Sequence, residues 1–159
     1  MRARIASSIV VAAAILLGTA GCDLVQPQAT TTDYLASNGV DADLGDIAIR
    51  NAVVVTDKGV LGNLVMTVVN DSSERARFTV QHGGDKDVTV SVPPSSTTVF
   101  GYPDGDTVLL RGLDAQPGAL VPIYFQAGDD AGQEVLVPVL NGGLPEYKDL
   151  LPVDVVTDK

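Results

Sequence analysis

Hydrophobic and polar residues alternate in short runs over most of the chain after residue 43. In RARFTVQ (75–81), Ala76, Phe78 and Val80 fall on one side of an extended chain, and charged or polar residues fall on the other. Because successive side chains of a strand point to opposite faces, such runs predict strands with one buried face. Turn sequences rich in Gly, Asp, Ser and Pro separate them. The candidate strands are residues 46–55, 60–70, 75–81, 88–92, 97–102, 107–113, 119–126 and 134–140.

This pattern predicts an all-β fold, an Ig-like or cupredoxin-like β-sandwich of seven or eight short strands, because no long segment has a helical period. Two prolines, Pro122 and Pro138, fall inside candidate strands, so those strands are expected at a sheet edge or at a bulge. Four residues of the first strand follow the period of two and are expected on one face: Ile47, Ile49, Val53 and Val55.

The segments that flank the alternating region differ from it in composition. Residues 23–43 mix Pro, Gln, Thr, Ser and Asn without a period, which is typical of a flexible linker. The end of the chain combines Gly, Pro and charge and is expected to be mostly irregular, although its LLPVDVV stretch is apolar enough to dock on the sandwich or on a partner. The chain is therefore divided into a signal peptide (1–21), a lipidated N-terminus and linker (22–43), a β-sandwich (44–141) and a C-terminal tail (142–159).

The first residues have the order of a secretory signal. Arg2 and Arg4 precede an apolar run of 13 residues, Ile5–Leu17, and the small residues 18–21 follow it. A helix that spans a bilayer needs about 20 apolar residues, so a removable signal is favoured over a membrane anchor or a buried helix.

Cys22 follows this signal directly and is the only cysteine of the chain. The sequence Thr19-Ala20-Gly21-Cys22 resembles a bacterial lipobox, in which the cysteine receives a diacylglyceryl group on its sulfur and the signal is removed. The resemblance implies a protein anchored by lipid to the cell membrane, on its extracytoplasmic face. A buried structural cysteine or a free thiol is the alternative. No intramolecular disulfide can form, so the exported domain must be stabilised by its core.

The chain is acidic, with a formal charge of −10. Removal of residues 1–21 takes away two of the ten basic residues and no acidic ones, which leaves a formal charge of −12. A surface with this charge repels phosphate groups, so nucleic acid is excluded as a partner and electrostatic binding to anionic lipid is disfavoured.

The residues needed for catalysis are not arranged in any recognisable set. No Gly-x-Ser-x-Gly motif occurs, and the serines at 72, 73, 95 and 96 fall in turn sequences. Asp104 and Asp106 lack the spacing of a calcium loop and are typical of a turn. After removal of the signal, the remaining soft or borderline metal donors are His82, in a glycine-rich turn, and Met66. We therefore expect no enzyme, and we keep His82 and Met66 as candidate metal ligands.

The segment 106–140, DTVLLRGLDAQPGALVPIYFQAGDDAGQEVLVPVL, resembles the closing part of PCuAC-type periplasmic copper chaperones. With its lipobox, the chain is similar to the actinobacterial LpqE-type lipoproteins, which carry such a domain. The resemblance implies a similar sandwich and an accessory role beside respiratory-chain complexes. The copper-binding His-x-Met pair of the chaperones falls on Thr107 and Leu109, which cannot hold copper, so the resemblance does not carry the metal site or a cofactor over to this chain.

Together these features predict a non-catalytic lipoprotein, held to the membrane through Cys22, whose β-sandwich binds a protein partner. The partner is expected at the outer face of the membrane, in a cell-envelope or respiratory complex. The alternative hypothesis is a module that handles metal, like a copper chaperone, or binds a small ligand, which requires His82, Met66 and the acidic loops to converge.

Overall fold

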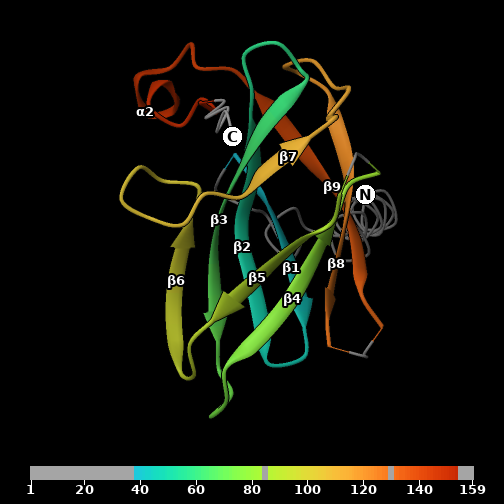
Figure 1. Cartoon of the computed structure of the whole chain (residues 1–159), viewed down its shortest axis with the longest axis vertical. Coiled ribbons are helices and arrows are strands. Elements are labelled where there is room, and N and C mark those ends of the chain that lie inside the picture. The colour runs from blue at the N-terminus through green and yellow to red at the C-terminus, as the bar shows by residue number, and fades with distance from the viewer. Residues whose placement is uncertain (1–37, 84–85, 129–130, 154–159) are drawn as a thin grey trace, which may run out of the picture. The chain divides into compact units, whose positions relative to one another are not determined.

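The computed structural model describes residues 38–83, 86–128 and 131–153, which belong to one compact unit, Leu35–Lys159. These residues form nine strands and one short helix (Figure 1), so the prediction of an all-β fold is confirmed. The elements are β1 (Val40–Leu44), β2 (Ile47–Val55), β3 (Leu61–Asn70), β4 (Ala76–Gln81), β5 (Val88–Val92), β6 (Ser96–Phe100), β7 (Leu109–Arg111), β8 (Leu120–Ala127), β9 (Gln133–Leu140) and α2 (Pro145–Lys148).

The strands form one sheet that curls into a nearly closed, barrel-like sandwich. Their order is β5-β4-β8-β9-β2-β3-β6, with β1 paired to β2 and β7 paired to β3. All pairs are antiparallel except β2–β9, a parallel contact limited to Val54–Val139 and Val55–Leu140. The expected hairpin between residues 119–126 and 134–140 is present as β8–β9. The two terminal strands of the order, β5 and β6, come into contact as the sheet curls.

One hydrophobic core fills the inside of this curled sheet. Phe78 on β4, Phe100 on β6 and Phe125 on β8 are 1%, 2% and 0% exposed. The rings of Phe78 and Phe125 meet edge to face, with centroids 6.3 Å apart and an interplanar angle of 61°. Aromatic pairs in this geometry are favourable beyond the area they bury. Phe78 and Phe125 lie on the neighbouring strands β4 and β8, whereas Phe100 lies on β6 at the far end of the strand order, so the core is complete only when the sheet closes around it.

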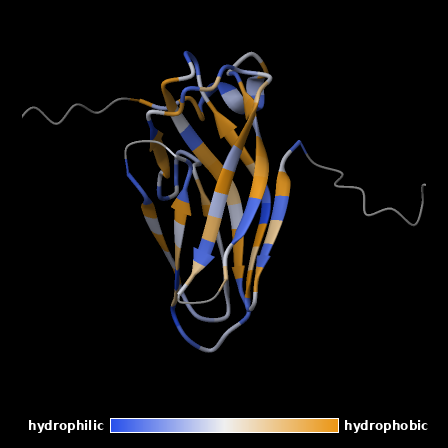
Figure 2. Ribbon diagram, turned by 90° about the vertical axis from the view of Figure 1, so that its right-hand side faces the viewer, coloured by the Kyte–Doolittle hydropathy of each residue, from blue (hydrophilic) through white to orange (hydrophobic). Residues whose placement is uncertain are grey.

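The short strands β4 and β5 follow the period of two. Figure 2 shows orange and blue bands along several strands of the sheet. On β4, Phe78 and Val80 are buried between more exposed neighbours, and on β5, Val90 and Val92 are buried on either side of Ser91. Alternation of this kind is typical of an antiparallel sheet with one face on the core.

Strand β2 departs from that period at a β-bulge. Its register with β3 shifts between Arg50 and Val53, and Asn51 there has a φ of +54°. A bulge inserts one unpaired residue, so the residues beyond it change faces. Four β2 residues therefore share the main core, namely Ile47, Ile49, Ala52 and Val54. The prediction that Val53 and Val55 lie on the same face as Ile47 and Ile49 is wrong, because the extra residue reverses the alternation.

The tail covers the side chains that the bulge turns outward. Leu150 is 3% exposed and packs with Val53, Val55 and Val65 in a second, smaller cluster. Leu150, the first residue of the LLPVDVV stretch, thus docks on the sandwich, whereas residues 154–156 of that stretch lie outside the described residues. One helical turn, α2, precedes Leu150 within the stretch expected to be irregular. In Figure 1 this helix lies at the end of the sandwich where β2 turns into β3.

Strand β1 lies within the segment expected to be a linker. Residues 40–43 are ordered in this strand, so the sandwich begins before residue 44. Ala42 and Leu44 are buried in the core. Two hydrogen bonds to Asn51, at the bulge of β2, hold the start of β1 in place. Gly39 N–H donates to Asn51 Oδ1 at 2.9 Å, and Asn51 N–H donates to Asp41 Oδ1 at 2.9 Å. A short run with two inward apolar residues was too weak a pattern to separate from the linker.

The prolines inside strands occupy places where each strand is paired on one side. Pro122 and Pro138 take part in the β8–β9 ladder. The pairing of β8 with β4 begins only at Tyr124, and the pairing of β9 with β2 begins only at Val139. Proline has no N–H to donate to a second neighbour. The prediction that these strands lie at a sheet edge or at a bulge is wrong, because β8 and β9 are interior strands with a regular ladder. Each proline is tolerated because it lies in the part of its strand that pairs on one side only.

We expect the bulge to depend on the left-handed backbone of Asn51. Replacement Asn51→Val puts a β-branched residue at a positive φ and removes the bond to Gly39, whereas Asn51→Gly removes the bond but accepts the backbone. The Val variant should lower the free energy of unfolding by about 2 kcal/mol more than the Gly variant, as measured by urea denaturation. Equal losses would show that the backbone conformation at residue 51 contributes nothing.

Candidate functional site

The predicted lipidation site, Cys22, lies outside the described residues, so lipidation stays a prediction. Within residues 38–83, 86–128 and 131–153, no helix is long and apolar enough to cross a membrane.

The two candidate metal ligands have different surroundings. Met66 is 1% exposed on β3, within the main hydrophobic core, opposite Phe100. His82 follows the end of β4, is partly exposed and does not belong to that core. Met66 therefore acts as a packing residue. Within the described part of the chain, no three or more His, Cys, Asp or Glu side chains group closely enough to hold a metal ion.

His82 nevertheless has a perturbed ionisation. Partial burial removes water from the imidazole and lowers its pKa below the usual 6.5, and the negative charge of Asp87 offsets part of this effect. The neutral imidazole is thus favoured in the folded protein.

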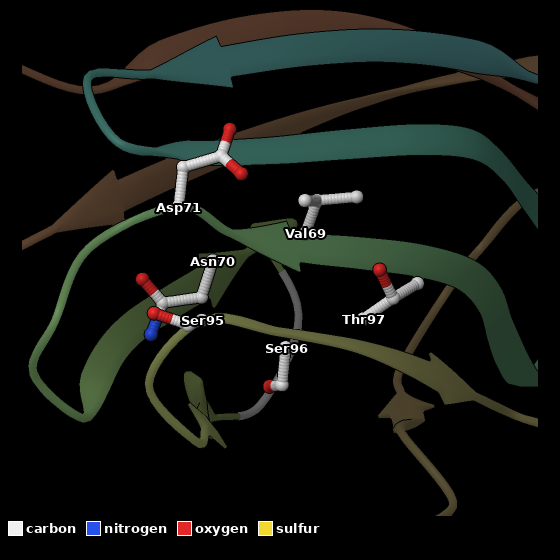
Figure 3. Close-up of a pocket in the computed structure, with 6 residues that line it drawn as sticks. All are labelled: Val69, Asn70, Asp71, Ser95, Ser96 and Thr97. Carbon is white, nitrogen blue, oxygen red and sulfur yellow. The ribbon is translucent and has the colours of Figure 1, made fainter.

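A polar hollow of about 180 Å³ lies at the ends of β3 and β6 (Figure 3). Figure 3 shows Val69, Asp71 and Thr97 on one face of these paired strands, with Asn70 and Ser96 on the other. The pairs Val69–Thr97 and Asn70–Ser96 explain this alternation, because directly opposed residues share a face.

The side chain of Asn70, which lines this hollow, has a structural role. The side chain is 0% exposed, and its Nδ2 donates to the carbonyls of Glu74 and Pro93, both at 2.8 Å. Its Oδ1 accepts from the N–H and the hydroxyl of Ser72, at 3.1 and 2.7 Å. These bonds tie the β3–β4 turn to the β5–β6 turn. A fully bonded buried amide of this kind stabilises the turns and leaves no group for a ligand.

A more distinctive surface lies on the outside of the β8–β9 hairpin, at the right of Figure 1, the side that Figure 2 turns to the viewer. Leu120 lies opposite Pro138, and Pro122 lies opposite Leu136. Since opposed residues of an antiparallel ladder share a face, the four form one apolar patch, which we call the Leu-Pro face. Leu120 and Leu136 are 58% and 54% exposed, and the next pair on the same face is Tyr124 with Glu134.

A second surface, the tail groove, lies between β3, the β6–β7 loop and the tail, with a volume of about 390 Å³. Asn63 of β3 is only 4% exposed and forms its base. Pro152 also lines a second hollow, together with Val60. The groove is lined by Asn63, Gly101, Tyr102, Pro103, Thr107, Leu109, Asp149, Leu151, Pro152 and Val153.

The side chain of Asn63 joins the two walls of this groove. Its Nδ2 donates to Gly101 O at 2.7 Å and to Leu150 O at 2.9 Å. Its Oδ1 is buried and has no hydrogen-bond partner among the described residues. Two carbonyl acceptors on the nitrogen fix the orientation of the amide, because the flipped form would place oxygen against oxygen. The base of the groove therefore holds an open acceptor.

Neither surface was found from the sequence, although one of them has a signal there. The tripeptide Leu-Val-Pro occurs twice, at 120–122 and 136–138. In the antiparallel β8–β9 ladder, Val121 pairs with Val137 on the core face, and each leucine lies opposite a proline on the outer face. The tail groove has no comparable signal, because its base residue belongs to β3 and its walls come from distant segments.

Sequence comparison with protein-family models and with curated proteins finds no match. The resemblance to the LpqE-type lipoproteins accordingly stays a prediction. Thr107 and Leu109, at the positions where that family carries copper ligands, both line the tail groove.

We predict that protonation of His82 weakens the fold. Because its folded pKa lies below 6.5, the unfolded state binds more protons as the pH falls through that value, and the free energy of unfolding decreases. The decrease should appear between about pH 7.5 and about pH 5.5 in urea denaturation, and it is assigned to His82 because the chain has 1 histidine. His82→Gln should flatten this slope. Asp87→Asn should lower the imidazole pKa further in an NMR titration, and a rise would contradict the assignment.

Proposed function

We propose that this protein is a non-catalytic lipoprotein, anchored through Cys22 at the extracytoplasmic face of the cell membrane, that binds a protein partner through the Leu-Pro face. The observation that carries this proposal is the contiguous exposed apolar surface on β8–β9, where Leu120 and Leu136 are both more than half exposed. Apolar patches with a polar margin are typical of protein–protein contacts.

The chemistry of the Leu-Pro face suits a protein partner. Complete burial of a leucine side chain is favourable by about 1.5–3 kcal/mol, so burial of the exposed halves of Leu120 and Leu136 contributes about 1 kcal/mol each. Pro122 and Pro138 hold the backbone rigid, which lowers the entropy lost on association. With Glu134 beside the face and a formal charge of −12 on the chain after removal of residues 1–21, the partner is expected to present an apolar centre with basic residues around it.

The serine hydroxyls support a role without catalysis. Ser72 Oγ donates to Asn70 Oδ1 at 2.7 Å, Ser95 Oγ to Ser72 O at 3.2 Å, and Ser96 Oγ to Pro93 O at 2.8 Å. Ser95 bonds across to the β3–β4 turn, whereas Ser72 and Ser96 bond within their own turns, and none of these three bonds is to a basic side chain. A nucleophilic serine requires an adjacent general base, so these serines are assigned to the turns.

The proposed lipid anchor is tested by replacing Cys22. Cys22→Ser removes the thiol that would carry the diacylglyceryl group, and two or more acyl chains are what hold such a protein firmly to a membrane. We expect the wild-type protein in the membrane fraction with a lipid-modified mature N-terminus by mass spectrometry. The variant should lack the lipid, and a wild-type protein with an unmodified thiol would contradict the proposal.

The Leu-Pro face is tested by placing a charge at its centre. Leu136→Asp leaves the core untouched, and we expect it to reduce recovery of the partner from mildly solubilised membranes by about tenfold, since an unpaired charge is costly in an apolar interface. Val99→Asp is the matched control, because Val99 is also exposed, at 43%, but lies on β6. Circular dichroism checks that both variants fold. Equal recovery with both variants would show that the partner binds elsewhere.

A further inference from the structure

The tail groove is separate from the Leu-Pro face and has its own chemistry. Its wall is mostly apolar, with Leu109 and Leu151 on opposite sides and Tyr102 at 42% exposure. The groove's volume of about 390 Å³ lies within the usual range for small-molecule sites. An apolar wall with a few polar groups is the usual composition of such a site, and the polar groups decide which ligand fits.

Those polar groups accept hydrogen bonds or carry negative charge. Asp149 supplies a carboxylate at the tail side, and Asn63 supplies the open Oδ1 at the base. Thr107 adds a hydroxyl, which is able to accept or donate. None of the described residues that line the groove is basic. Asp104 and Asp106, exposed in the same β6–β7 loop, add negative charge nearby.

The unpartnered Oδ1 of Asn63 is a second observation, independent of the acidic side chains, that indicates a ligand with a hydrogen-bond donor. A buried polar atom without a partner costs about 1–3 kcal/mol, a cost that a ligand N–H would remove. Since Oδ1 is covered by its surroundings, a ligand reaches it by displacing a residue of the groove wall. Val153, which lines the groove, is 74% exposed.

We propose that the tail groove binds an organic cation, a primary ammonium or guanidinium group on an apolar body. The cation faces the Asp149 carboxylate and lies against the Tyr102 ring, an arrangement that attracts cations. One N–H donates to Asn63 Oδ1, and the apolar body packs on Leu109 and Leu151. The cation comes either from a free amine or from the lysine or arginine side chain of a polypeptide, since both present the same group. This proposal goes beyond partner binding and does not rest on the Leu-Pro face.

The test is an NMR titration of the isotope-labelled protein with four probes. Hexylammonium is the cation, hexanol and hexanoate are its neutral and anionic matches, and N-acetyl-lysine N-methylamide represents a polypeptide side chain. We expect a cation to shift the amide resonances of Tyr102, Leu109 and Val153 at concentrations where hexanol and hexanoate do not. Tighter binding of hexylammonium identifies a free amine as the source, and tighter binding of the lysine derivative identifies a polypeptide.

A pair of variants locates the binding. Asp149→Asn keeps the side-chain shape and removes the charge that lines the groove, so we expect it to weaken cation binding by about fivefold. Glu146→Gln removes the same charge from neighbouring α2, outside the groove lining, and should leave the affinity unchanged. The proposal is overturned if no cationic probe binds, if hexanol or hexanoate binds as tightly as hexylammonium, or if the two variants behave alike.

Discussion

The reversal of strand β2 at Asn51 is the constraint on which the rest of this structure depends. One residue with a φ of +54° interrupts the ladder, so β2 contributes Ile47 and Ile49 to the core before it and Val54 after it. A regular strand would have sent Val53 and Val55 inward. The bulge also fastens β1, because the backbone of Asn51 and its side chain bond to Asp41 and Gly39. A single local conformation thus sets both the core and the start of the domain.

The outer surface follows from the same reversal. Val53 lies opposite Val65, and Val55 lies opposite Asn63, so all four share the face that the tail covers. Leu150 packs on the valines of this face, and its carbonyl accepts a hydrogen bond from Asn63. The tail groove exists because an amide lies at the margin of this apolar face, where the tail is held by both packing and hydrogen bonds. Docking of the tail and formation of the groove are therefore one event.

The Leu-Pro face and the tail groove present different chemistry. The Leu-Pro face is a flat sheet surface made rigid by prolines, and it offers apolar area without buried polar groups, which suits a large complementary surface. The tail groove is a hollow with acceptors at its base and margin, which suits a small group that donates hydrogen bonds. The net negative charge of the chain gives both surfaces a surrounding negative potential that favours basic partners.

The sequence by itself determined the all-β class and the alternating strands β4 and β5, because the period of side chains along a strand is a local property. The prolines led to a wrong prediction of edge strands or bulges, because β8 and β9 are interior strands whose pairing is one-sided only near the prolines. The sequence did not reveal the bulge at Asn51, the strand at 40–44 or the tail groove. These features depend on pairing between distant segments: Asn51 with Asp41, and Asn63 with Gly101 and Leu150. Only the tertiary structure decided them, because a hydrogen bond between residues far apart in the sequence produces no periodic pattern of hydrophobic and polar residues.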